Sequence, residues 1–274
     1  DVIHNIYRHR KRFVHKGSFG HALLIGGNRE MGGAILMAGQ ASITSGAGKT
    51  TLAVSDRLIP VINTSLPGVM TSVIDDDASV VDVNWQQYNV VAVGPGMGTG
   101  QIAQDRLYSL LTRYGGSLIL DADALNVLSM NSGWMKLLPP YSILTPHPGE
   151  FERLFGPVDN SIDAFRIQHE MSDRYQVIII RKGAHTSITF PGEKIWFNIT
   201  GNPSLAKGGT GDILTGVIAG LIAQGYSPSE AALFGVWLHG KAADIAIKSI
   251  GVESVDSDDI NRGIKKIFRE LNSL

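Results

Sequence analysis

Short β-rich runs alternate with helical patterns along almost the whole chain, and this alternation constrains the fold more than any other feature. The pattern is typical of βα units, so it predicts a mainly parallel sheet flanked by helices in a three-layer α/β/α fold. The last two strands should be antiparallel, because the turn sequence Pro191-Gly192-Glu193 joins them. The predicted strands are Ala22–Gly26, Thr51–Ser55, Val69–Ile74, Asn89–Val93, Ser117–Asp121, Ser142–Thr145, Val177–Lys182, Ser187–Phe190 and Lys194–Asn198.

The clearest predicted helix follows Asp212, because its apolar residues recur at helical spacing and form a stripe typical of a core helix. No linker, low-complexity tract or internal repeat interrupts the chain, so we expect a single domain over residues 1–274. The stripe consists of Ile213, Leu214, Val217, Ile218, Leu221 and Ile222. The predicted helices are Gly33–Ser45, Gln101–Tyr114, Pro148–Phe155, Ile162–Tyr175, Gly211–Gln224, Ser229–Ser249 and Asp258–Leu271.

Composition excludes several classes of protein. With 43% hydrophobic and 18% charged residues, the chain has the usage of soluble globular proteins. A net charge of −1 gives no general attraction to nucleic acid or to an anionic membrane, and the short basic run Arg8–Arg12 predicts a solvated face. The sequence lacks cysteine, an apolar run of membrane length and a signal-peptide pattern, so we expect a cytoplasmic protein. Because it starts with Asp1 rather than Met, we also expect some N-terminal sequence to be missing.

Two glycine-rich segments resemble phosphate-binding loops but fail the test of their pattern. The run Ser45–Thr50 has Ile43 where a P-loop needs glycine, and it follows a helix and precedes a strand. We interpret it as the turn that ends a helix. In Val93–Gly98 the third glycine has the wrong spacing for a dinucleotide loop, and Pro95 removes a backbone donor. Close approach to a ligand and a tight turn alone remain equal alternatives for this segment.

The third glycine-rich segment, Ala206–Asp212, fits an anion site better. Its glycines lead directly into the predicted helix, whose first backbone N–H groups and dipole favour a phosphate. Lys207 adds a positive charge, and Asp212 places a carboxylate in the first turn of the helix. Phosphoryl transfer needs a base to take the proton of the attacking hydroxyl. Asp212 is therefore the candidate catalytic base, and the alternative is an ordinary first-turn anion at a helix start.

Two further segments place polar side chains at predicted strand ends. In Thr145–Glu150, His147 could bind substrate and Glu150 could hold metal-bound water. For an isolated His or Glu a capping or surface role is the better interpretation, so the functional one depends on the neighbouring segments. In Leu120–Asn126, Asp121 and Asp123 could contact magnesium, while helix capping by Asp123 is an equal alternative.

Taken together, these segments resemble the ATP- or ADP-dependent NAD(P)HX dehydratases of the ribokinase-like superfamily. The resemblance covers most of the chain, and the segments occur in the same order. Gly32 is a departure, since a proline is common there. The matching segments are His15–Gly20, Gly32–Ala34, Gly94–Gly98, Leu120–Asn126, Leu144–Glu150, Lys182-Gly183 with Thr186, and Gly201–Asp212.

The resemblance implies a ribokinase-like fold and a repair reaction. Enzymes of this family remove water from NAD(P)HX, the hydrated form of NADH or NADPH, at the expense of ATP or ADP. Asp212 would deprotonate the ring hydroxyl, and Mg²⁺ would bridge the nucleotide phosphates with several waters. The family also implies a homotetramer and a partner NAD(P)HX epimerase. The implied substrate contacts are Ala34, Gly96, His147 and Asp212; the implied nucleotide contacts are Lys182, Gly183, Ala184, His185, Thr186, Gly208, Gly209, Thr210 and Gly211; additional candidates are Asn126, Glu150, Asn202 and Lys207.

Two other functions share parts of this pattern. A small-molecule alcohol kinase of the same superfamily, such as a hydroxyethylthiazole kinase, would use the same anion loop and base. A non-catalytic nucleotide sensor would keep the loop without needing Asp212. The intact Gly-Gly-Thr-Gly-Asp sequence argues against the sensor.

Overall fold

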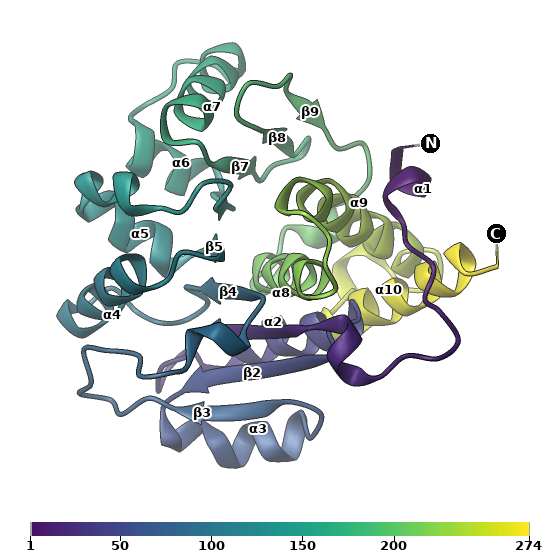
Figure 1. The fold of residues 1–274 in the computed structure, drawn as a ribbon. Helices are drawn as coiled ribbons and strands as arrows, with labels where there is room; N and C mark the ends of the chain where they lie inside the picture. The colour runs from purple at the N-terminus through teal and green to yellow at the C-terminus, as the bar shows by residue number, and fades with distance from the viewer. Residues whose placement is uncertain (1, 274) are drawn as a thin grey trace.

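The computed structural model describes residues 2–273, and a nine-stranded sheet runs through its centre (Figure 1). Strands β1 to β7 are parallel, and β8 and β9 are antiparallel additions at one edge. Every strand predicted from the sequence is present, with bounds that differ by a few residues. The strands are β1 His21–Ile25, β2 Lys49–Val54, β3 Met70–Val73, β4 Val90–Val93, β5 Ser117–Leu120, β6 Ile143–Leu144, β7 Ile178–Arg181, β8 Ser187–Thr189 and β9 Trp196–Phe197.

The order of the strands creates a switch point in the sheet. The order is β3-β2-β1-β4-β5-β6-β7-β8-β9, so the chain builds outward from β1 in one direction and then returns to its other side at β4. Ligands of open α/β sheets bind beyond the carboxyl ends of the strands, at such a reversal. The edge formed by the carboxyl ends of β1 to β7 is therefore where the fold offers binding sites.

Helices cover both faces of the sheet, as the three-layer prediction required. One face packs against α2, α3, α8, α9 and α10, and the other against α4, α5, α6 and α7. All the helices predicted from the sequence are present, whereas α1, α3 and α5 were not predicted. The helices are α1 Val2–Ile6, α2 Gly32–Thr44, α3 Ile59–Ser65, α4 Gln101–Arg113, α5 Asp123–Met130, α6 Pro148–Phe155, α7 Ser161–Tyr175, α8 Thr210–Ala223, α9 Pro228–Ala246 and α10 Ser257–Leu271, with short 3-10 turns at Lys16–Phe19, Asp56–Leu58, Trp85–Gln87, Ser132–Leu137, Pro203–Leu205 and Val252–Ser254.

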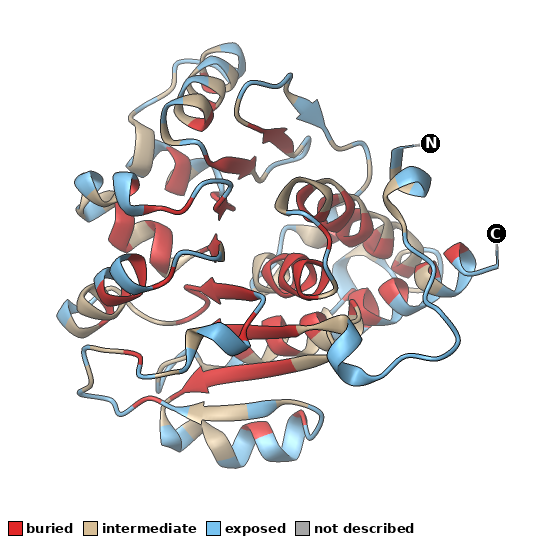
Figure 2. Ribbon diagram, in the orientation of Figure 1, coloured by how far each residue is buried: buried red, intermediate tan, exposed pale blue. Residues whose placement is uncertain are grey.

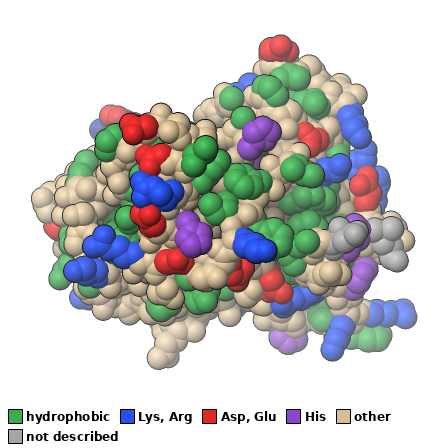
Figure 3. Space-filling model, turned by 90° about the horizontal axis from the view of Figure 1, so that it is seen from above, with side chains coloured by type: hydrophobic (Ala, Val, Ile, Leu, Met, Phe, Trp, Pro, Cys, Tyr) green, Lys and Arg blue, Asp and Glu red, His purple; other side chains and the backbone are tan. Residues whose placement is uncertain are grey.

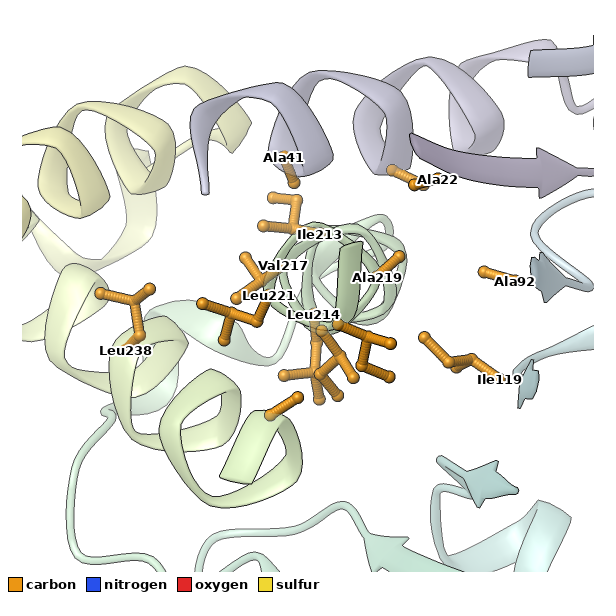
Figure 4. Close-up of a cluster of buried hydrophobic side chains, with 14 of the residues drawn as sticks. Ala22, Ala41, Ala92, Ile119, Ile213, Leu214, Val217, Ala219, Leu221 and Leu238 are labelled. Carbon is orange, nitrogen blue, oxygen red and sulfur yellow. The ribbon is translucent and has the colours of Figure 1, made fainter. Parts of the chain in front are cut away.

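Helix α8 is the centre of the core. Every residue from Ile213 to Ala223 is buried, so the predicted stripe extends round the whole helix (Figure 2). Side chains of α8 point toward α2, α9 and the sheet (Figure 4). Glycine lets α2 approach closely, since a Cβ on Gly216 would lie 2.0 Å from the carbonyl oxygen of Ala38. The N-terminus of α8, and with it Asp212, is therefore held by a tightly packed helix.

Two local predictions are tested by the structure. The segment after α2 is a turn, as predicted, with Gly46 in the left-handed region at φ 109°. The basic N-terminal run is exposed, as predicted, but it is also anchored to the body of the protein. Arg8 forms an ion pair with Glu230 at 2.8 Å, and Arg10 donates to the carbonyl oxygen of Gly46.

Acidic, basic and hydrophobic side chains are interspersed over the face shown in Figure 3. Within residues 2–273, the structure contains no helix that is both long and apolar enough to span a bilayer.

Candidate active site

Polar side chains follow one another along the carboxyl edge of the sheet. Asp121 comes directly after β5, Thr145 after β6 and Lys182 after β7, and these three strands are neighbours. The first turn of α8 faces the same point, since a Cβ on Gly211 would lie 3.1 Å from Lys182 Nζ and 3.9 Å from Asp121 Oδ2. The sheet thus brings together side chains from four separate segments of the chain.

Asp121 is the centre of a buried hydrogen-bond network. Its side chain is 1% exposed, and Lys182 Nζ lies 2.8 Å from Oδ1. Thr145 donates to Oδ1 at 2.8 Å, and Thr215 of α8 donates to Oδ2 at 2.7 Å. Burial alone would raise the pKa of Asp121, but the Lys182 charge and these hydrogen bonds lower it. Asp121 is therefore ionised and holds Lys182 beside the first turn of α8.

Glu150 shares the charge of Lys182. Its Oε2 lies 4.0 Å from Lys182 Nζ, and the side chain is almost fully buried. Burial raises the pKa of Glu150, while Lys182 opposes that effect. Burial would lower the pKa of Lys182, but the charges of Asp121 and Glu150 raise it. The lysine therefore remains an ammonium between the carboxyl groups of Asp121 and Glu150.

Asp212 lies beside this cluster in the first turn of α8. Burial is the main reason that its pKa rises to about 7, and the negative charge of Asp121 adds to the effect, while Lys182 opposes it. A general base works best when its pKa is close to the working pH. The structure thus gives Asp212 the proton affinity that a base near neutral pH requires.

The glycine-rich segment before α8 has the form of an anion site. Gly209 adopts a left-handed φ of 90° at the N-cap, and no side chain caps the helix. The Thr210 hydroxyl donates to the carbonyl oxygens of Leu205 and Lys207, at 2.7 and 2.9 Å, and so fixes the loop. The first amides of a helix have no partners within it. They remain available for a phosphate.

Lys207 differs from its prediction. The sequence suggested that it adds positive charge to the anion loop, but its ammonium donates to the backbone carbonyls of Glu253 and Val255. In this arrangement Lys207 ties the loop to the segment before α10. The cation beside the first turn of α8 is Lys182 instead.

A cavity of about 550 Å³ opens beside the anion loop. Of the predicted nucleotide contacts, Lys182, Gly183, Ala184, Thr186, Thr210 and Gly211 line it, whereas His185 is exposed and is not part of its wall. The wall also includes Asn202, whose amide donates to Asp244 at 3.0 Å. The remaining lining residues are Asn198, Thr200, Gly201, Pro203, Leu205, Ala206, Leu214, Val236, His239 and Gly240.

His239 in the wall of this cavity was not predicted from the sequence. Its side chain is 8% exposed, and its Nε2 has no hydrogen-bond partner among the described residues. Burial, together with the charge of Lys182, lowers its pKa to about 4, so the ring is neutral. A lone histidine inside a helical pattern gives no sequence signal that separates a core position from a ligand contact.

On the other side of Asp212, His147 and Glu150 cap α6. His147 Nδ1 accepts from the N–H groups of Gly149 and Glu150, and the Glu150 carboxylate accepts from the His147 N–H at 2.8 Å. This arrangement is the capping alternative of the sequence analysis, and it leaves the His147 side chain half exposed at the carboxyl edge.

Asp123 is not a helix cap, which corrects one alternative of the sequence analysis. It is the first residue of α5, and its Oδ2 accepts from the N–H of Gly98 at 2.8 Å. Asn126, one turn later, accepts from the Arg153 guanidinium at 3.0 Å. The capping prediction failed because the chain enters α5 through Ala122 at φ 48°, which places Asp123 inside the helix.

The Gly94–Gly98 segment is a tight turn against α2. Gly96 adopts φ 63°, and a Cβ there would lie 2.4 Å from the Met31 carbonyl oxygen and 3.3 Å from the Ala34 Cβ. Only glycine fits this turn without strain. Gly96 and Ala34, predicted as substrate contacts from distant parts of the chain, are therefore direct neighbours.

The carboxylates of the site do not form a metal site on their own. Among the described residues, no group of three or more His, Cys, Asp or Glu side chains could hold a metal ion. Asp121 and Glu150 are both engaged with Lys182. A Mg²⁺ ion at this site would need most of its ligands from phosphate and water.

The fold is ribokinase-like, and its site combines a glycine-rich anion loop with a buried carboxylate. The hydroxyethylthiazole kinase of Pyrococcus horikoshii has the same fold, with a TM-score of 0.63 at 11% identity over 97% of this chain and 91% of that one. The chain belongs to the NAD(P)H-hydrate dehydratase family, whose model matches residues 22–266.

Individual relatives agree with this assignment. The ADP-dependent (S)-NAD(P)H-hydrate dehydratase of Bacillus subtilis is 39% identical over 234 residues, 84% of this chain and 82% of the relative. The crystal structure of the ADP/ATP-dependent NAD(P)H-hydrate dehydratase of Bacillus subtilis, co-crystallized with ATP/Mg²⁺, has a TM-score of 0.87 at 32% identity over 98% and 96% of the two chains. The bifunctional NAD(P)H-hydrate repair enzyme of Moorella thermoacetica is 34% identical over 96% of this chain. The chain spans about half of that relative, 52% of its length.

Proposed function

We propose that this chain removes water from (6S)-NAD(P)HX, the hydrated form of NADH or NADPH, at the expense of ADP or ATP. The observation that carries the proposal is the position of Asp212, a carboxylate with its pKa raised to about 7 in the first turn of an uncapped helix. A base and an anion site meet at this turn. Membership of the NAD(P)H-hydrate dehydratase family supports the choice of substrate.

Hydroxide is a poor leaving group, so the reaction first converts the ring hydroxyl into a phosphate ester, from which phosphate leaves readily. Asp212 takes the proton of the ring hydroxyl as the hydroxyl oxygen attacks the terminal phosphoryl group of the nucleotide. AMP leaves if the nucleotide is ADP, and ADP leaves if it is ATP. The lone pair of the ring nitrogen then expels phosphate from the ring, and loss of a proton from the adjacent C5 restores the double bond. The amides of Gly208–Gly211 stabilise charge on the transferring group.

The two substrates are proposed to bind on opposite sides of Asp212. We propose that the adenine nucleotide occupies the cavity of about 550 Å³, where Lys182 faces its phosphates and the unpaired Nε2 of the neutral His239 is offered to it. The hydrated nicotinamide ring lies toward Gly96, Ala34 and His147. Asn202 and Lys207 act through the structure of the loop rather than by direct contact, because their side chains are engaged elsewhere.

Mg²⁺ is proposed to arrive with the nucleotide, held by phosphate oxygens and water, with Glu150 as a contact of that water. It neutralises phosphate charge when bound. We further propose a single catalytic domain over residues 1–274, a homotetramer, and a cytoplasmic location with an NAD(P)HX epimerase as functional partner. The bifunctional relatives, of which this chain spans about half, support the pairing with a second repair activity.

Product analysis tests the proposal and separates it from an alcohol kinase. The protein is incubated with NADHX, ADP and Mg²⁺, and NADH, AMP and phosphate are measured together. We expect the three products to appear in equal amounts. A stable phosphorylated alcohol formed from hydroxyethylthiazole, with no NADH from NADHX, would favour the kinase instead.

A further inference from the structure

A second cavity, of about 510 Å³, lies at the carboxyl edge beyond the Gly94–Gly98 turn. It opens at the ends of β1, β2 and β4, where the strand order reverses. Its volume is that of a site for a small organic ligand. Since the nucleotide cavity is at the β7–β9 side of the sheet, Asp212 lies between two cavities. The apolar lining residues are Ile25, Ala53, Val54, Ile74, Val81, Val93, Met97, Ile102, Ala103 and Leu110.

The walls and the mouth of this cavity differ in chemistry. Ala53, Val93 and Ala103 in its wall are buried and apolar. Arg29, Arg57 and Asp76 line the mouth, where Arg57 Nε lies 3.4 Å from an Asp76 carboxylate oxygen. An apolar slot with charges at its opening suits a flat base that carries a polar, anionic tail. One nucleotide of a dinucleotide, with its base, ribose and phosphate, has this chemistry.

Arg106 holds one wall of the cavity in place. Its Nε donates to the carbonyl oxygen of Ala78 at 2.6 Å, and its Nη2 donates to those of Asp75 and Asp76 at 2.6 and 2.9 Å. The loop after β3 is thereby fixed against α4. The cavity is preformed, so a ligand does not have to order this loop on binding.

The loops of the cavity are continuous with those of the candidate substrate site. The Gly27 N–H donates to the Pro95 carbonyl oxygen at 2.8 Å, which joins the loop after β1 to the turn after β4. Gly27 and Met97 line the cavity, whereas Gly96, which precedes Met97 in the chain, packs against Met31 and Ala34. Neighbouring strands are about 5 Å apart. The ends of β1 and β2 are therefore about 5–10 Å from the end of β4, a span that a diphosphate linker bridges.

We propose that this cavity binds the adenosine half of the dinucleotide substrate, with adenine against the apolar wall, the phosphates at Arg29 and Arg57, and the ribose hydroxyls at Asp76. The proposal rests on the proposed function, because it takes NAD(P)HX as the substrate. The adenosine half of NAD(P)HX takes no part in the reaction and needs a binding site of its own. The cavity of about 550 Å³ beside the anion loop is already assigned to ADP or ATP. The second cavity lies on the opposite side of Asp212 and is built from the loops that hold Gly96.

Truncating the substrate tests the proposal. Kinetics are measured with NADHX and with the hydrated form of reduced nicotinamide mononucleotide, which lacks the adenosine half. Ala103→Phe fills the cavity and Arg57→Ala removes a charge at its mouth, while Arg113→Ala, an exposed arginine at the other end of α4, is the matched control. For Ala103→Phe we expect kcat/KM for NADHX to fall about tenfold or more, toward the value for the mononucleotide. Turnover of the mononucleotide and the KM for ADP should stay within about twofold of the wild type, which also shows that the variant is folded.

The proposal is overturned if Ala103→Phe leaves kcat/KM for NADHX unchanged, or lowers it equally for both substrates. A binding measurement keeps the test independent of turnover. The fluorescence of NADH reports its Kd in the presence of saturating ADP, and Ala103→Phe should weaken that Kd about tenfold. If the wild type turns over neither substrate, the proposed function has failed, and the effect of Ala103→Phe on NADH binding still decides whether the cavity holds the adenosine half.

Discussion

Replacing Asp212 with Asn should stabilise the folded protein. Burial and the nearby charge of Asp121 raise the pKa of Asp212 from 3.8 to about 7. A tenfold change in proton affinity corresponds to about 1.4 kcal/mol. The ionised carboxylate therefore destabilises the folded state by about 4 kcal/mol at pH 8, and asparagine, which has the same shape without the charge, removes this effect.

The sign of the pH dependence follows from the direction of the pKa change. The folded chain holds the Asp212 proton more tightly than the unfolded chain, so its stability falls as the pH rises from 3.8 toward about 7 and the loss is complete above that. The advantage of the Asp212→Asn variant should be about 4 kcal/mol at pH 8 and about 2 kcal/mol at pH 5. Function at this site is thus expected to reduce stability.

Urea denaturation at both pH values, without nucleotide, measures these differences. Asp82→Asn, at an exposed position, is the control and should change the free energy of unfolding by less than about 0.5 kcal/mol. The reasoning would be refuted if Asp212→Asn were no more stable than the wild type at pH 8, or if its advantage were the same at pH 5 and pH 8.

The role of Asp212 as a base, the packing of α8 and the hydrogen bond of Thr215 can be tested separately. Because Asp212 must be ionised to act as a base, kcat/KM should rise about tenfold per pH unit up to about pH 7 and then level off, and a flat pH profile from 5 to 8 would contradict this role. Gly216→Ala should lower the free energy of unfolding by about 3 kcal/mol, because its Cβ would meet the Ala38 carbonyl oxygen at 2.0 Å; Gly115→Ala, with open space around it, should leave thermal unfolding unchanged. Thr215→Val should lower the free energy of unfolding by about 1–3 kcal/mol, because it removes a hydrogen bond at 2.7 Å to the buried Asp121; unchanged urea denaturation would show that this bond contributes nothing.

The sequence predicts the layers of this fold well because its signals are local. Each buried parallel strand is a short apolar run, and α8 repeats its apolar residues at helical spacing. The short helices α3 and α5 were missed, since a few turns next to turn-forming residues give little periodicity. Asp212 could be selected because a glycine-rich loop, a carboxylate and a helix start are adjacent along the chain.

The remainder of the site depends on contacts between distant residues. Asp121 meets Lys182 and Thr215, which are 61 and 94 positions away, and nothing near Asp121 in the sequence indicates either partner. The same dependence on distant residues explains why the predicted role of Lys207 was wrong. Its charge is visible in the sequence, but the direction of its side chain is set by carbonyl groups of Glu253 and Val255. His239 has no local signal at all, because its role depends on a cavity that the fold creates.

Asp212 is proposed to act as the base of a nucleotide-dependent dehydration. The most direct measurement compares turnover of NADHX with ADP binding in the wild type and in Asp212→Asn. We expect the variant to bind ADP at least as tightly as the wild type and to lose about a hundredfold to ten-thousandfold in kcat, as expected for removal of a general base. An Asp212→Asn variant that regenerates NADH from NADHX at the rate of the wild type would contradict this proposal.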